Sequence, residues 1–99
     1  MADVNDPGSP IAWLALEPGT LVAASDGTLV GQVEEVHAEP DVDIFEGLVV
    51  QTARGPRFVD ADLVADLYER LVRLRITVDE VARLPEPRPA PRIIDVEPP

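Results

Sequence analysis

The chain has 99 residues, a formal net charge of −11, 45% hydrophobic but only 4% aromatic residues, and no cysteine. This length indicates one domain with a modest aliphatic core, and the absence of cysteine excludes disulfides, zinc–thiolate sites and a thiol nucleophile. The negative charge disfavours contact with a phosphate backbone, so we expect no direct nucleic-acid partner.

Residues 1–10 are polar and interrupted by prolines, which predicts a disordered segment ahead of a domain over residues 11–84. The start carries no basic residue and no long apolar run, so we expect a cytoplasmic protein without membrane insertion. The apolar run 11–16 is a short strand or a helical turn that covers one mouth of a barrel. Trp13 within it is interpreted as a core plug.

A β-hairpin is the clearest pattern in the chain. Strands are predicted over residues 21–25 and 28–38, joined at Asp26-Gly27, because this dipeptide between apolar runs favours a tight turn. Gly31 inside the return strand indicates a bulge or a sharp bend. Val33 and Val36 are three residues apart, so a second bulge near residues 34 and 35 is needed to keep both in the core.

An acidic loop follows over residues 39–44, and then strands are expected over 45–52 and 57–59. Oxygen-rich loops can bind calcium, but this one lacks the glycine and the terminal bidentate glutamate of a calcium-binding loop. We therefore interpret it as a solvated loop and expect no metal and no cofactor. The weak metal candidates are Glu39, Asp41, Asp43 and Glu46.

Residues 60–76 fit two patterns. Leucines and a valine at helical spacing, with acid–arginine pairs four residues apart, favour a helix. The alternation of Val72, Leu74 and Ile76 with polar residues favours a strand with Arg73 and Arg75 outward. Next, Thr77 and Glu80 form a predicted capping box for a short helix from Val78 to about Arg83, ended by Pro85.

The order of these elements resembles the PRC-barrel family, a small β-barrel found in a reaction-centre subunit, a ribosome maturation factor and small stand-alone actinobacterial proteins. The likeness covers about residues 16–84 and is carried by Gly19–Val22, Ser25–Gly27, Val30–Val33, Gly47–Val50, Phe58–Val64 and the closing part 72–85. It implies a turn at 62–64 and strands at 65–69 and 71–76 in place of a helix. The expected fold is mostly β: a small barrel of about six strands, a short C-terminal helix and an extended proline-rich tail over residues 85–99.

The sequence offers little catalytic chemistry. His37 is the single histidine, and no serine–histidine–aspartate arrangement accompanies it. The resemblance implies no catalytic residues either, because the family shares none. We therefore expect no enzyme.

The predicted function is a non-enzymatic protein-interaction or adaptor module that uses the barrel surface and self-associates as a homodimer with unidentified further protein partners. Residues 1–50 carry a charge of −10 and residues 51–99 a charge of −1, so acidic and arginine-bearing surfaces of two copies can meet. Arg73 and Arg75 are candidate contacts, although the favoured alternative is that they pair with Glu34, Glu35 or Glu46 on adjacent strands. Ile93, Ile94 and Val96 are candidates for strand addition to a neighbour. The alternatives are a ligand- or metal-binding barrel and, by family analogy, an RNA- or ribosome-associated factor.

Overall fold

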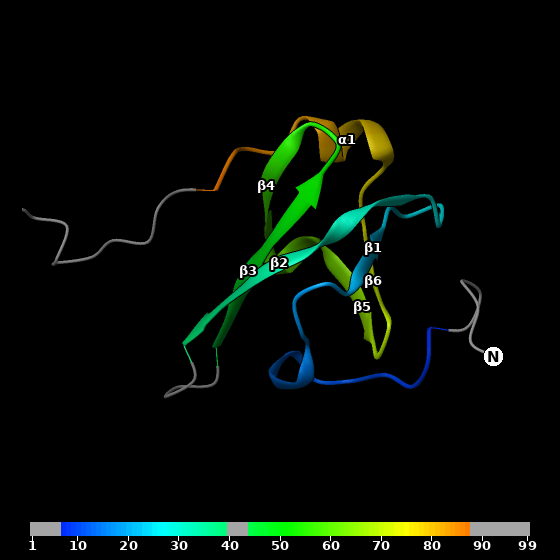
Figure 1. Cartoon of the computed structure of the whole chain (residues 1–99), viewed down its shortest axis with the longest axis vertical. Helices are drawn as coiled ribbons and strands as arrows, with labels where there is room; N and C mark the ends of the chain where they lie inside the picture. The colour runs from blue at the N-terminus through cyan, green and yellow to red at the C-terminus, as the bar shows by residue number, and fades with distance from the viewer. Residues whose placement is uncertain (1–6, 40–43, 88–99) are drawn as a thin grey trace, which may run out of the picture.

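Six strands form one curled sheet, a half-barrel, in the computed structural model of the chain, which describes residues 7–39 and 44–87 (Figure 1). The sheet order is β4-β3-β2-β1-β6-β5; β1 and β6 pair in parallel, and the other neighbours pair antiparallel. The expected mostly-β, barrel-like fold with one short helix is confirmed. The strands are β1 (Leu21–Ala23), β2 (Leu29–Glu39), β3 (Ile44–Thr52), β4 (Gly55–Asp60), β5 (Val64–Tyr68) and β6 (Leu71–Leu74).

The β1–β2 hairpin forms where the sequence predicts it. Gly27 has a φ of +92°, which an L side chain rarely adopts, and its N–H donates to the Ala24 carbonyl at 2.9 Å. The Asp26 carboxylate accepts from the Thr28 N–H at 2.9 Å. Val22 is opposite Gly31 and Ala23 is opposite Leu29, so one extra residue of β2 lies beside Gly31. The predicted irregularity at this glycine is confirmed.

The second predicted bulge is also present in β2. Val33 is opposite Val50 and Glu35 is opposite Val49, which leaves Glu34 as the extra residue. The extra residue shifts the alternation of the strand, so that Val33 and Val36 both point to the core side of the sheet. As a result Val33 is only 1% exposed, and Val36 packs against the core from its edge.

The segment after β4 is extended rather than helical, as the PRC-barrel resemblance implied. The Asp60 carboxylate accepts from the Asp62 N–H at 3.1 Å and caps one 3-10 turn, η3 (Ala61–Leu63). The chain then forms the β5–β6 hairpin, in which Val72 and Leu74 are buried and Arg73 is exposed. Burial of alternate residues thus overrides the helical spacing of the leucines.

Helix α1 (Val78–Ala82) begins at the predicted capping box. The Thr77 hydroxyl accepts from the Glu80 N–H at 3.2 Å, and the Glu80 carboxylate accepts from the Thr77 N–H at 2.9 Å. Val81 inserts from this helix into the core. After the helix, the Pro85 carbonyl accepts from the Phe58 N–H at 2.9 Å, so the chain runs beside the outer edge of β4.

The core is aliphatic. Its fully buried side chains come from five strands and are Leu48, Leu74, Val22, Val33, Val50, Val59 and Val72. Trp13 is half-buried and is not part of this core, so its interpretation as a core plug is corrected. The buried residue of the lead-in is Leu16, which follows a 3-10 turn, η1 (Trp13–Ala15), the helical-turn alternative considered for this run.

The described part of the N-terminal segment lies against β5. The Arg70 N–H donates to the Pro7 carbonyl at 2.8 Å, and the Glu69 N–H donates to the Ser9 carbonyl at 3.0 Å. Residues 7–10, which we expected in a disordered segment, therefore extend the sheet by a short pairing. The two prolines do not prevent it, because the segment pairs through the Pro7 and Ser9 carbonyls and the Ile11 N–H and needs no proline N–H. Within the described residues, no helix is long and apolar enough to cross a membrane.

Candidate docking groove

An open groove of about 390 Å³ lies beside β5. Four segments that are distant in the sequence form its walls: the N-terminal segment, the start of β3, η3 and β5. With one exception the lining side chains are uncharged, and they are Pro10, Ile11, Phe45, Ala61, Val64, Ala65, Asp66, Leu67 and Tyr68.

The edge of β5 borders the groove with backbone hydrogen-bonding groups as well as with apolar side chains. β5 is the last strand of the sheet, and its outer edge is only partly paired. Pairing with the N-terminal segment reaches as far as the Ile11 N–H, which donates to the Leu67 carbonyl at 3.0 Å. Beyond Ile11 the chain turns into η1. Among the described residues nothing else pairs with this edge, so it is a place where an extended peptide can add.

An exposed apolar rim continues the groove surface. The Trp13 and Phe45 rings stack with centroids 6.1 Å apart and an interplanar angle of 11°. Their sequence neighbours Leu14 and Ile44 are 68% and 50% exposed. We call Trp13, Leu14 and Phe45 the apolar rim. Ile44 is not included, because successive strand residues point to opposite faces and Phe45 faces the groove. Apolar side chains beside a groove are typical of a surface that binds another molecule.

The single charged group of the lining is neutralised by a neighbouring strand. Asp66 on β5 accepts from Arg73 on β6, with distances of 2.8 Å to Nη2 and 3.2 Å to Nε. The hydrogen bond that Arg73 donates to Asp66, together with the negative charge of Asp66, raises the pKa of Arg73 above the ordinary value. The groove therefore presents apolar side chains and a paired carboxylate, a combination that suits apolar segments better than ions.

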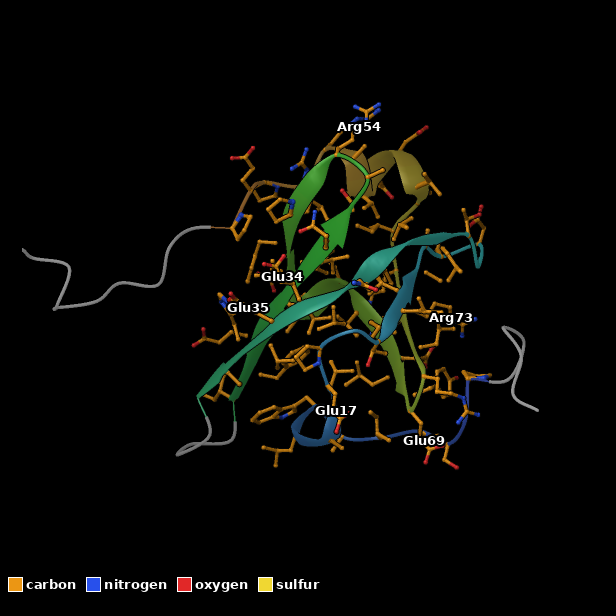
Figure 2. The ribbon with its side chains drawn as sticks, viewed as in Figure 1. Glu17, Glu34, Glu35, Arg54, Glu69 and Arg73 are labelled. Atoms are coloured by element: carbon orange, nitrogen blue, oxygen red, sulfur yellow. The ribbon has the colours of Figure 1, made fainter. Side chains whose placement is uncertain are left out.

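The predicted pair Arg73 and Arg75 does not form a free basic stripe. Arg73 is bound to Asp66, and the Arg75 Nε donates to the Asp62 carbonyl at 3.2 Å. Pairing was one of the two alternatives, but the partners differ from the expected glutamates. Figure 2 shows why: Glu34 and Glu35 project from β2 on a different side of the molecule from Arg73.

The weak metal candidates are only partly described. Glu46 is exposed on β3. Asp41 and Asp43 lie outside the described residues, as does the side chain of Glu39. In the part of the chain that the structure describes, no group of three or more histidine, cysteine or carboxylate side chains is placed to hold a metal. Ile93, Ile94 and Val96 likewise lie outside the described residues.

The contacts of His37 indicate that it packs against neighbouring side chains of the sheet. Its Nε2 is 2.9 Å from the Glu35 Oε1, and its ring is tilted against Phe58 with centroids 5.6 Å apart. The Phe58 ring in turn lies over Gly47, since a Cβ built there would be 2.6 Å from the Phe58 Cζ. An aromatic ring over a strand glycine is a known stabilising device in sheets.

No protein-family model matches the chain, and no curated protein is similar to it. Sequence reasoning did not predict the groove, because residues from four separate segments form it. One available signal was the apolar run 11–16 beside prolines, which indicated a segment that packs on the barrel without belonging to its regular strands.

Proposed function

We propose that the chain is a non-enzymatic protein-interaction module that binds an extended polypeptide segment in the groove beside β5. The observation that carries this proposal is the meeting of an apolar groove with a partly unpaired strand edge. A bound segment gains backbone hydrogen bonds from the edge and places alternate side chains in the groove. The apolar rim adds contact area next to it.

We also propose that the module belongs to the PRC-barrel family and acts in the cytoplasm. The motifs between residues 19 and 85 support the family assignment, and the half-barrel of six strands is compatible with it. The lack of cysteine is compatible with a reducing compartment.

Self-association is the second part of the proposed function. Its support is the difference in charge between the acidic residues 1–50 and the nearly balanced residues 51–99. Arg54 and Arg83 are exposed and have no recorded carboxylate partner among the described residues, so they are better placed than Arg73 for such a contact. A dimer held by these charges should dissociate as salt is raised, which sedimentation equilibrium measures directly.

The groove is tested with Ala65→Arg, which places a long charged side chain at the edge of β5. Ala53→Arg, the same change in the exposed β3–β4 turn, is the matched control. A random peptide library is selected against the unchanged chain. We expect enriched sequences with alternating β-branched residues that bind the unchanged chain and Ala53→Arg but not Ala65→Arg. Equal binding to Ala65→Arg, or no enrichment, would contradict the proposal.

A small apolar ligand is a second candidate occupant, because the groove volume of about 390 Å³ falls within the range of ligand sites, roughly 300–1,000 Å³. Any ligand that binds the native state must raise the melting temperature. A thermal-shift screen with metabolites and metal ions, run on the unchanged chain and on Ala65→Arg, separates this function from peptide binding.

A further inference from the structure

After α1 the chain returns to β4, the strand that continues into η3 at the wall of the groove. The hydrogen bond between Phe58 and Pro85 holds the chain beside β4. Ala61, which lines the groove, is three residues beyond Phe58. At about 3.3 Å per residue, Ala61 lies roughly 10 Å along the chain from Phe58, the residue beside Pro85. The six residues from Pro87 to Ile93 span about 19 Å in the extended conformation that alternating prolines favour.

The chemistry of the C-terminal segment fits the surfaces along this route. Arg88 and Arg92 come first, and the tail would pass the exposed Asp60 and Asp62 at the end of β4 and in η3. Ile93, Ile94 and Val96 follow, interrupted only by Asp95, within reach of the groove. All three side chains are β-branched, which favours an extended strand.

Charge does not oppose this docking. Residues 88–99 contain two arginines, one aspartate and one glutamate, so they carry no net charge, whereas the whole chain carries −11. A neutral segment is not repelled by the acidic body. An acidic peptide from another protein would be repelled.

We infer that the groove beside β5 is occupied, before a foreign segment binds, by the C-terminal segment of the same molecule, with Ile93, Ile94 and Val96 against the lining. The inference rests on the proposed function and names the first occupant of the groove. A short linker gives the tethered segment an effective concentration of the order of millimolar, which exceeds that of a second copy at micromolar concentration. A foreign segment then has to displace the tail, which lowers its apparent affinity.

The test uses full-length chains. Ile93→Asp/Ile94→Asp removes two of these apolar side chains, and Pro98→Asp/Pro99→Asp adds the same charge beyond them. Trp13 is the only tryptophan and lies against Phe45 of the lining, so its fluorescence reports on the groove. We expect the isoleucine variant alone to change this fluorescence and to shift the amide NMR signals of residues 64–68, while light scattering gives the same molecular mass for all three chains.

A synthetic peptide of residues 88–99 is then titrated into the unchanged chain and the isoleucine variant. We expect it to bind the variant at least tenfold more tightly, and Ala65→Arg in the variant to abolish binding. Unchanged Trp13 and amide signals in the isoleucine variant would overturn the inference, as would a dimer that this variant dissociates. If peptides from the library still bind in the groove, the proposed function survives that result; if no peptide binds, both fail.

Discussion

Gly31 shows how closely β2 and β3 approach at one residue. A Cβ built at this position would collide with the carbonyl oxygen of Gln51 and would be 3.1 Å from the Val50 Cγ1. Backbone cannot move aside as a flexible side chain can. We therefore expect Gly31→Ala to lower the free energy of unfolding by about 1–3 kcal/mol, as overpacking does. Urea denaturation measures the loss. Gln32→Ala, at the exposed neighbouring position, should stay within about 0.5 kcal/mol, and an equal loss there would contradict this account.

Asp26 links the β1–β2 turn to pH. The hydrogen bond from the Thr28 backbone N–H favours the ionised carboxylate and lowers the pKa of Asp26 below its ordinary value. Because the folded state then binds fewer protons than the unfolded state, the contribution of this carboxylate is present above pH of about 4 and is lost as the pH falls through the lowered pKa. Asp26→Asn cannot titrate. The difference in unfolding free energy between the unchanged chain and this variant should shrink on acidification below about pH 4. A difference that is constant with pH would rule out this linkage.

Among the elements, α1 has only five residues and depends on its cap. Helices of this length are not stable alone, so the capping box and the burial of Val81 hold it in place. Thr77→Ala removes the acceptor for the Glu80 N–H and should cost about 0.5–2 kcal/mol. Thr77→Ser keeps the hydroxyl and should recover most of the loss. Thermal unfolding of the two variants tests this; an equally destabilised serine variant would show that the methyl group, and not the cap, is responsible.

The strand elements show which features of this sequence are readable in advance. The hairpin at Asp26-Gly27, the bulge at Glu34 and the helix cap at Thr77 each depend on a few adjacent residues, and each was predicted. The segment 60–76 was not decided by its own pattern. Its helical spacing gives way because β5 and β6 pair with each other and β6 pairs with β1, a contact across about 50 residues of sequence.

Long-range contacts also explain what could not be predicted. The pairing of residues 7–11 with β5 and the groove between that segment, η3 and Phe45 arise only when the half-barrel has curled. Arg73 shows the same limit at the level of one side chain. Its alternation predicted that it points outward, but its partner Asp66 depends on a register with a bulge between Val64 and Asp66.

At the scale of the whole molecule, a comparison of two leucines distinguishes side chains that stabilise the fold from side chains that are available for binding. Leu74 is 1% exposed in the core, whereas Leu14 in the apolar rim is 68% exposed. The same truncation to alanine should therefore have unequal effects. Leu74→Ala leaves a cavity in a small aliphatic core and should cost about 2–5 kcal/mol. Leu14→Ala removes a side chain that is already mostly in solvent, so it should lower the free energy of unfolding by less than about 0.5 kcal/mol.

The Leu14→Ala variant also tests whether the apolar rim binds a partner. If the rim binds a partner segment, Leu14→Ala should weaken the peptides selected against the groove while the melting temperature stays the same. Isothermal titration and thermal unfolding of the same preparation give both values. A leucine that can be removed without loss of stability but with loss of binding has its role in the complex and not in the fold. A melting temperature that falls together with the affinity would instead make Leu14 part of the packing of η1 on the half-barrel.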